Sequence, residues 1–275
     1  MNDQTQPRVL SEPGKPILEG VNWGGLKTLY IKEVRRFFKV HMQTIWAPAI
    51  TTLLYLVIFT VALGRSGKTV MGVPFADFIA PGLIMMGMLQ NSFANASFSL
   101  MVGKMQGTIV DYLMPPLSTG ELIAALVSAA VTRAFLVGGA VWLVMSLWPS
   151  VHVSIAHPLT ALWFGLMGSL MLAFLGVITS IWADKFDQAA MVTNFVVTPL
   201  SLLSGTFYSV EQLSPAFRAV SHANPFFYII SGFRHGFLGV TDSPVLFGAG
   251  LLLAINVTLF VLCYLLLRSG WKIKN

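Results

Sequence analysis

Charged side chains are scarce in this sequence of 275 residues, of which Asp, Glu, Lys and Arg together make up 10%. A soluble domain carries about a quarter charged residues, whereas 55% of this chain is hydrophobic and its mean hydropathy is +0.74. So few charges cannot cover a water-facing surface, and much of the exterior must therefore face lipid. The composition excludes an ordinary soluble domain and predicts an integral membrane protein.

Cysteine is almost absent as well. The one cysteine, Cys263, lies in an apolar run, which excludes an intramolecular disulfide framework and a metal site made of several cysteines. The formal net charge of +6 could indicate a nucleic-acid partner, but that function needs basic residues gathered on a soluble face. Most of the basic residues here flank apolar runs, so we expect membrane lipid and no nucleic acid as a partner.

Residues that could perform covalent chemistry are also few. No two histidines have metal-ligand spacing beside a carboxylate, and neither a G-x-S-x-G motif nor a carboxylate pair lies in an apolar run. A relaxed phosphate-loop pattern, A-x-x-x-x-G-K-T, occurs at 62–69, but that motif works between a strand and a helix of a soluble fold. Here it closes an apolar run, as a short outer loop does. We therefore predict no enzyme activity, no metal site and no cofactor in this chain.

Long apolar runs dominate the rest of the sequence. A helix needs about 20 apolar residues to cross about 30 Å of hydrocarbon, and it satisfies its own backbone hydrogen bonds where water is absent. Arg133 is the only formally charged residue inside any run that qualifies. The sequence predicts an all-α integral membrane fold whose transmembrane domain, 46–267, has six helices at 46–63, 78–101, 122–148, 159–183, 188–210 and 245–267.

Lysine and arginine indicate the orientation of the chain, since cytoplasmic loops of membrane proteins carry an excess of both. With both termini inside, most of these residues fall on the cytoplasmic side. Residues 1–22 are polar and interrupted by prolines and glycines, without the apolar core of a signal peptide. We expect both ends in the cytoplasm (N-in, C-in), with a flexible tail at 1–22 and a short tail at 268–275.

Residues 23–45 differ from both the tail and the spans. Apolar residues recur there at helical spacing, and basic residues lie on the opposite side. This pattern predicts an N-terminal amphipathic helix at the interface, with its apolar face at the acyl boundary and its cations among headgroups. It is either a basic anchor or a strut that contacts a cytoplasmic partner. The basic residues are Lys27, Lys32, Arg35, Arg36 and Lys39.

Two connections between the predicted spans are too structured to be simple turns. Residues 104–117 mix apolar and polar side chains and end at Pro115 and Pro116, as a short cytoplasmic helix does. Residues 211–244 contain an apolar stretch that is too short to cross the membrane and too apolar for open water. We expect a re-entrant or interfacial helical hairpin there, on the outer side.

Uncharged polar residues follow one face of two predicted spans at steps of three or four. Such side chains avoid lipid and face other helices or a wet cavity. Hydrogen bonding between helices explains them, and a substrate pathway lined by the second and fifth spans is the functional alternative. The residues are Asn91, Asn95 and Ser99 in the second span and Asn194, Thr198, Ser201 and Gly205 in the fifth.

Arg133 lies about midway along the third predicted span. A charge near the bilayer centre costs at least about 2.5 kcal/mol on insertion scales, so this side chain should face protein, with a carboxylate or backbone carbonyls as its partner. Glu121 precedes it by roughly 18 Å along an ideal helix, which is too far for a direct contact. We expect Arg133 to be a buried structural charge, with substrate binding as the alternative.

Two blocks of motifs give the chain a resemblance to a known family. The first begins at Pro81-Gly82, continues through GTIVDYLMPPLS at 107–118 to Glu121, and is followed by Arg133. The second comprises LSGTFY at 203–208, EQLSP at 211–215, NPFFY at 224–228 and RHGFLG at 234–239. In these motifs and their order the chain resembles the membrane permeases of ABC-2 type ATP-binding-cassette exporters.

That resemblance implies a multi-pass permease of the cytoplasmic (inner) membrane of a bacterium, paired with a second permease subunit as a homodimer. Two copies of a separate ATPase subunit would dock below it and hold the ATP and magnesium. Residues 23–45 are similar to the family's connecting helix, 104–117 to its coupling helix, and the fifth span with the outer segment to its central gate. The coupling residues that it implies are Lys104, Gly107, Asp111, Leu113, Pro116 and Glu121.

Two other classes of function stay open. A self-sufficient channel or ion-coupled secondary transporter would need no ATPase, although the spans hold no carboxylate to carry a proton. A membrane enzyme that acts on lipids is the third class. Outward transport is implied by the resemblance alone, and the residues do not identify the substrate.

Overall fold

Helices make up most of the structure, a computed structural model that describes residues 20–62, 67–149 and 151–272. The predicted all-α fold is confirmed for these residues apart from one short antiparallel hairpin, β1 (Thr69–Val70) and β2 (Val73–Pro74). The hairpin stands where a short loop was predicted. The predicted tail at 1–22 falls outside the described residues except for 20–22, and so does 273–275 of the predicted C-terminal tail.

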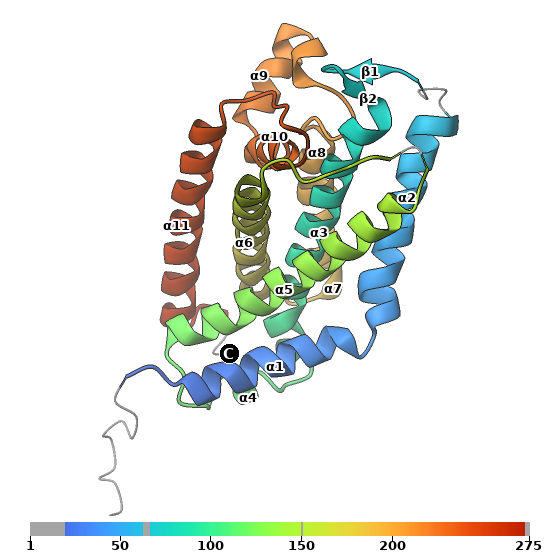
Figure 1. Cartoon of the computed structure of the whole chain (residues 1–275). Helices are drawn as coiled ribbons and strands as arrows, with labels where there is room; N and C mark the ends of the chain where they lie inside the picture. Colours follow the sequence, from blue (N-terminus) through green and yellow to red (C-terminus); the bar gives the residue numbers. More distant parts are fainter. Residues whose placement is uncertain (1–19, 63–66, 150, 273–275) are drawn as a thin grey trace, which may run out of the picture.

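Two long helices form the centre of the bundle. α3 (Phe75–Met105) and α6 (Pro158–Trp182) pack along each other, and most side chains of α3 are buried. α5 (Thr119–Ser146) packs across α3, and α11 (Val245–Ser269) covers α6 from the other flank (Figure 1). The core of the protein therefore lies along α3.

Four helical segments in the described part of the chain are long and apolar enough to cross a membrane. They coincide, within a few residues at each end, with the predicted spans 46–63, 122–148, 159–183 and 245–267. The predicted span 78–101 lies inside α3, which is 31 residues long but carries polar side chains along its length. The count of six spans stays a prediction.

The helix predicted at 23–45 is interrupted. α1 (Trp23–Phe38) is followed by a turn, in which the hydroxyl of Thr44 donates hydrogen bonds to the carbonyl oxygens of Phe37 and Val40 at 2.9 and 3.2 Å. The apolar pattern continues through this turn, which is why the sequence predicted one helix. The chain then rises through η1 (Met42–Trp46), α2 (Ala47–Val57) and η2 (Ile58–Ala62), of which the first and last are π-helical.

α1 lies across the lower end of the bundle in Figure 1, with its apolar face against α5. Leu29 and Phe37 of this face are buried in protein. The prediction that this face lies at the acyl boundary is therefore wrong for Leu29 and Phe37, because these two side chains pack against protein instead. Trp23 and Phe38 stay exposed at its margins.

The span predicted at 188–210 is wrong in its last third. Its helical part ends at Leu202, and Gly205 adopts φ of +75°, a left-handed conformation that glycine favours. Because the apolar run continues beyond Leu202, hydropathy gave no sign of this end. The helical part consists of α7 (Phe186–Val192), the π-helical η3 (Thr193–Val197) and α8 (Thr198–Leu202).

The segment at 211–244 contains two consecutive helices, and the short 3-10 helix η4 (Val210–Gln212) overlaps its start. The re-entrant or interfacial hairpin on the outer side stays a prediction. α9 (Pro215–Ala223) and α10 (Pro225–Leu238) lie at the same end of the molecule as β1 and β2 (Figure 1). Asn224 caps α10, since its side-chain oxygen accepts a hydrogen bond from the Phe226 amide at 3.0 Å. The other predicted connection, 104–117, contains a single helical turn, α4 (Val110–Leu113).

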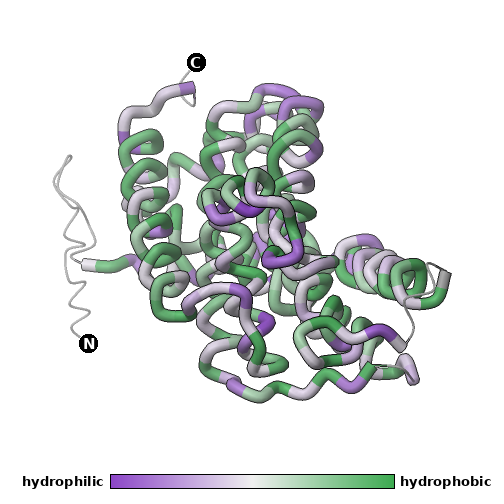
Figure 2. The backbone as a smooth tube through the Cα atoms, turned by 90° about the horizontal axis from the view of Figure 1, so that it is seen from above, coloured by the Kyte–Doolittle hydropathy of each residue, from purple (hydrophilic) through white to green (hydrophobic). Residues whose placement is uncertain are grey.

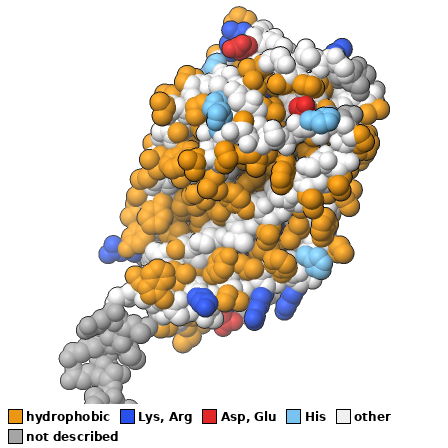
Figure 3. Space-filling model, in the orientation of Figure 1, with side chains coloured by type: hydrophobic (Ala, Val, Ile, Leu, Met, Phe, Trp, Pro, Cys, Tyr) orange, Lys and Arg blue, Asp and Glu red, His pale blue; other side chains and the backbone are white. Residues whose placement is uncertain are grey.

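The exterior is apolar around the middle of the bundle. Figure 3 shows hydrophobic side chains across the central part of one face, with lysines and arginines along the lower edge. Figure 2, seen from above, places α2 at one edge of the bundle and α11 at the opposite side. Such a belt suits a lipid surround. In α11 the exposed large apolar residues are Leu246, Phe247, Leu253, Val257, Phe260, Val261, Leu262 and Leu265.

Candidate functional site

A buried carboxylate joins three elements at the lower end of the bundle. Glu33 of α1 is fully buried and pairs with Arg36 one turn later at 2.8 Å. The hydroxyl of Ser99 in α3 donates to the same carboxylate at 2.8 Å, and the hydroxyl of Tyr112 in α4 donates to it at 3.0 Å. A buried charge is tolerated only when it is paired and hydrogen-bonded. These four residues, named the Glu33 junction below, therefore hold α1, α3 and α4 together.

Arg36 extends the Glu33 junction along α3. Its guanidinium donates to the backbone carbonyl of Asn95 at 2.9 Å and to the hydroxyl of Ser99 at 3.0 Å. The prediction that Arg36 lies among lipid headgroups is wrong, because this buried carboxylate and the carbonyl draw it inward. Asn95 and Ser99, both predicted to line a pathway, are instead buried at this contact.

Sequence reasoning missed Glu33, although a signal was present. It is the single acidic residue of a helix that otherwise carries lysines and arginines, and Arg36 stands three positions later. That spacing places the two side chains on one helix face. Burial and the neighbouring Glu33 carboxylate raise the pKa of the Tyr112 phenol, because both disfavour a phenolate at this place.

The carboxylate of Glu121, in the first turn of α5, binds backbone amides from two other parts of the chain. Its carboxylate accepts hydrogen bonds from the backbone amides of Asn22 at 2.5 Å and Ser118 at 2.6 Å, while the Ser118 hydroxyl accepts from the Glu121 amide at 3.3 Å. The second and third bonds form a capping box at the start of α5. Pro116, another predicted coupling residue, is tied to the same place by its carbonyl, which accepts from the Asn22 side chain at 3.1 Å.

The outward side of the α4 region is apolar. Four large apolar side chains are exposed there, and Asp111 is exposed among them. Gly107, with φ of +70°, lets the chain turn between α3 and α4. Of the predicted coupling residues, Asp111 and Leu113 therefore face outward from the fold. The exposed apolar residues, called the basal ridge below, are Met105, Val110, Leu113 and Met114.

Lys104, by contrast, is engaged within the chain. Its amine donates to the Ile181 carbonyl at 2.8 Å and to the Asp184 carboxylate at 3.1 Å, and Lys272 reaches the same carboxylate at 3.1 Å. Hydrogen bonds from Lys104 and then Lys272 lower the pKa of Asp184. The three charges connect the lower ends of α3, α6 and α11.

An open groove of about 510 Å³ runs between α2, α3 and α8. None of the described residues that line it is charged. Asn91 and Thr198, two of the predicted pathway residues, line this groove. The other five do not: Asn95 and Ser99 lie at the Glu33 junction, Ser201 is buried, the Gly205 carbonyl is bound by Arg234, and Asn194 is exposed elsewhere.

Arg133 contacts the wall of this groove. Its guanidinium donates to the side-chain oxygen of Asn91 at 2.9 Å, and its Nε is buried without a hydrogen-bond partner among the described residues. The prediction that Arg133 pairs with a carboxylate or with backbone carbonyls is wrong. The side-chain amide of Asn91, in the neighbouring helix α3, accepts its hydrogen bond instead. No carboxylate in the described part of the chain neutralises this charge.

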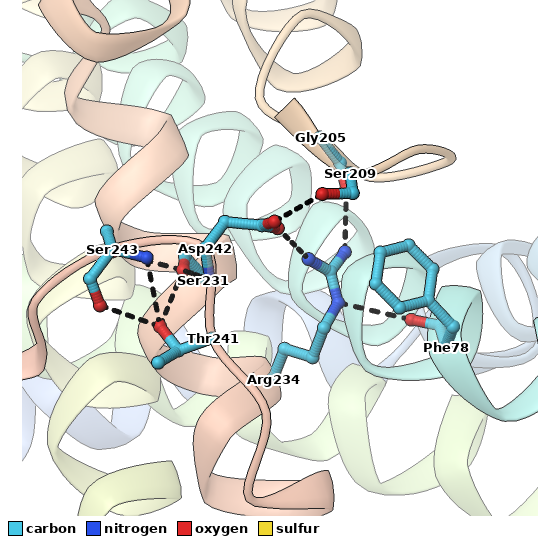
Figure 4. A network of polar contacts seen from close by, with 8 residues as sticks. All are labelled: Phe78, Gly205, Ser209, Ser231, Arg234, Thr241, Asp242 and Ser243. Atoms are coloured by element: carbon cyan, nitrogen blue, oxygen red, sulfur yellow. Dashed lines mark hydrogen bonds and ion pairs between the residues drawn. The ribbon is translucent and has the colours of Figure 1, made fainter. Parts of the chain in front are cut away.

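A buried arginine binds several segments together at the opposite end. Arg234 of α10 is 1% exposed, and Figure 4 shows it pointing toward the turn after α8. Its guanidinium donates to the Gly205 carbonyl at 2.6 Å and the Phe78 carbonyl at 3.2 Å, pairs with Asp242 at 3.2 Å, and stacks on the Phe78 ring. The hydroxyl of Ser209 donates to Asp242 at 2.5 Å. This Arg234 cluster joins α3, the turn after α8, α10 and the loop before α11.

Comparison with known proteins assigns the family. The sequence model of the ABC-2 type transporter family matches residues 25–238 of this chain. These residues include the Glu33 junction, the groove and Arg234. The chain belongs to the ABC-2 type transporter family.

Relatives agree with this assignment along nearly the whole chain. The inner membrane transport permease YadH of Escherichia coli K12 is 35% identical over 259 residues, which cover 92% of this chain and 98% of that protein. Nodulation protein J of Rhizobium leguminosarum bv. viciae is 25% identical over 90% of this chain and 95% of its own length. The nodulation protein J of Neorhizobium galegae is 31% identical over 76% and 78%. These relatives are thus proteins of about the same length as this chain.

Proposed function

We propose that this ABC-2 permease is the membrane subunit of an ATP-driven exporter and works as a homodimer with two copies of a separate ATPase. The observation that carries the proposal is the position of the basal ridge. Its residues are exposed at one end of the molecule, yet α4 is joined through Tyr112 and Glu33 to α3. A partner that pushes on α4 would therefore move a wall of the groove.

The proposed orientation places α1 and α4 in the cytoplasm of a bacterium, at its inner membrane. α1 lies at this end (Figure 1), and its exposed basic residues include Lys27, Lys32 and Arg35, as the excess of positive charge on the inner side requires. Both described ends of the chain lie there too (Figure 1). The name of the YadH relative, an inner membrane transport permease, supports the same location.

The proposed mechanism needs no covalent chemistry in this chain. ATP and magnesium are held by the ATPase subunits, whose closure would press on the basal ridge and shift α1, α3 and α4 as a unit. The groove then changes between inward-facing and outward-facing shapes, and transport requires that these two states bind the substrate with different affinity. The second permease subunit would cover the open side of the groove, where α2 exposes Ile50 and Leu54 and η2 exposes Ile58.

Reconstitution tests the ATPase partnership. The tagged full-length chain is purified from its native host with the soluble ATPase that accompanies it, and ATP hydrolysis is measured in vesicles. Leu113→Asp should abolish stimulation of the ATPase, because it places a charge in the apolar ridge. Phe217→Asp, an equally polar change at an exposed apolar residue of α9, is the matched control and should leave stimulation intact.

Two results would count against the proposal. Equal ATPase stimulation by the Leu113→Asp and wild-type chains would remove the basal ridge as the docking surface. Movement of solute by the purified chain alone, under an ion gradient and without ATPase, would establish the channel or secondary transporter instead.

A further inference from the structure

The charge of Arg133 is left without a counter-ion in the described chain. Arg36 and Glu33 neutralise each other at the Glu33 junction, whereas Arg133 has one hydrogen bond, to the uncharged Asn91. Arg36 and Arg133 carry like charges and repel each other. This inner part of the bundle therefore has one positive charge in excess, in a helix that is apolar enough to cross a membrane.

The groove between α2, α3 and α8 lies next to the charge of Arg133. Asn91 lines the groove and accepts the hydrogen bond from Arg133, so the guanidinium lies directly behind the groove wall. The Nε of Arg133 is buried without an acceptor. Buried arginine nitrogens in membrane proteins are ordinarily paired, and an anion at this end of the groove would supply the missing charge.

The groove is also polarised along its length. α2 rises while α3 descends (Figure 1), so Gln43 and Asn91 lie near the lower end of the groove and Phe59 near the upper end. Phe59 stacks on Phe207 with ring centroids 4.2 Å apart, which makes the upper end aromatic. A ligand that matches this groove is apolar at one end and polar or anionic at the other.

We propose that the groove binds an amphipathic anion, with its phosphate or similar charged group at the Asn91 end beside Arg133 and its apolar part toward Phe59 and Phe207. A guanidinium attracts an anion across one uncharged side chain when both charges are shielded from water. The binding site is independent of any ATPase. Its use for a transported molecule rests on the function proposed above.

Binding to the purified full-length chain in detergent tests the site. Dihexanoyl phosphatidic acid is the probe, and dihexanoyl phosphatidylcholine, with the same acyl chains and no net charge, is the reference; both are measured by native mass spectrometry. The wild-type chain should prefer phosphatidic acid by about tenfold or more, because its phosphate is attracted to the Arg133 charge that lies behind Asn91. Arg133→Gln should remove the preference.

The matched control removes one positive charge at the membrane surface. Arg268 is exposed at the end of α11, and Arg268→Gln should keep the wild-type preference. If Arg133→Gln fails to fold, Thr198→Trp provides a second arm, because the indole fills the groove opposite α3 and should weaken binding of phosphatidic acid about tenfold or more. Unchanged binding in Arg133→Gln or Thr198→Trp would overturn the proposal, as would a dimer in which a carboxylate of the second copy pairs with Arg133.

A transport experiment distinguishes the two possible sources of the anion, a transported amphiphile and a resident membrane lipid. The chain and its ATPase are reconstituted in phosphatidylcholine vesicles that contain labelled phosphatidic acid. ATP-dependent movement of the label across the bilayer supports a transported amphiphile, and Arg133-dependent binding without movement supports a resident lipid. If the proposed ATPase partnership fails, no solute moves with ATP, while the binding preference and its loss in Arg133→Gln are unaffected.

Discussion

The hydroxyl of Tyr112 in α4 lies 3.0 Å from the buried carboxylate of Glu33 in α1 and donates a hydrogen bond to it. Tyr112 is itself buried, although the residues on either side of it are exposed. The same carboxylate is bound by Ser99 of α3. A one-turn helix on the surface is thus anchored to the core by a single side chain, so motion of α4 must be shared with α1 and α3.

Tyr112→Phe should weaken this connection. The change removes the donor and leaves one oxygen of a buried carboxylate unsatisfied, which costs about 1.5–3 kcal/mol for a hydrogen bond to a charged group. We expect a loss of that size in unfolding by SDS, together with ATP hydrolysis that no longer drives transport. The double variant Tyr112→Phe/Glu33→Leu should be destabilised by less than the sum of the two single variants, since each single change removes the same hydrogen bond; full additivity would contradict the assigned contact.

Asp111→Lys should separate the permease from its ATPase while leaving insertion intact. Asp111 is exposed on α4 beside the basal ridge, so reversing its charge alters the docking surface and breaks no side-chain hydrogen bond or ion pair among the residues that the structure describes. Stimulation of ATP hydrolysis in vesicles is the measurement. Glu211→Lys at the opposite end is the control, because it makes the same charge change at another exposed residue; an equal effect of both variants would remove the specific role of α4.

Arg234→Met should destabilise the protein strongly. It breaks a buried pair with Asp242 and frees the carbonyls of Gly205 and Phe78, and loss of one partner of a buried pair costs about 3–5 kcal/mol. Unfolding by SDS measures the loss. Arg234→Met/Asp242→Leu should recover part of it, because the second change removes the unpaired carboxylate; a double variant less stable than Arg234→Met would show that the pair is not the source.

Gly236→Ala should disturb the contact between α10 and α6. A Cβ at Gly236 would lie 2.5 Å from the backbone nitrogen of Ala161, and a backbone atom cannot move aside as a side chain can. Overpacking of this kind costs about 1–3 kcal/mol. Gly250→Ala in α11 is the control, since nothing lies within 4 Å of the added carbon; thermal unfolding should separate the two variants, and equal melting temperatures would contradict the packing.

Acid should release the end of α11 from α3. Lys104 and Lys272 lower the pKa of Asp184 below its ordinary value of 3.8, so the stabilising contribution of this carboxylate is fully present above that value. It is lost as pH falls through the lower pKa of the folded state. Hydrogen exchange at the lower end of α11 should therefore increase in strong acid, and Asp184→Asn should show the faster exchange already at neutral pH. Equal protection in the Asp184→Asn and wild-type chains at pH 7 would rule this out.

Long helices bounded by clear end signals were predictable. The third, fourth and sixth predicted spans match α5, α6 and α11 because their apolar runs begin after the cap Ser118 or at Pro158, and end near the left-handed Gly270. The end of α8 at Leu202 was not predictable, because the apolar run continues into the turn that follows. There Asn224 binds the carbonyl of Leu200 in the last turn of α8, and Arg234 binds the carbonyl of Gly205. The partner that replaces helix hydrogen bonds is more than twenty residues away.

Composition and periodicity by themselves determined that this chain is a helical membrane protein, because too few charges exist to cover a water-facing exterior. The sequence motifs indicated the family to which the chain belongs. Only the tertiary structure decided where the polar side chains act: Arg36 lies with Glu33 and Ser99, Arg133 with Asn91, and Arg234 with Gly205. Hydropathy depends on local sequence, whereas these contacts join residues that become neighbours only when the helices pack.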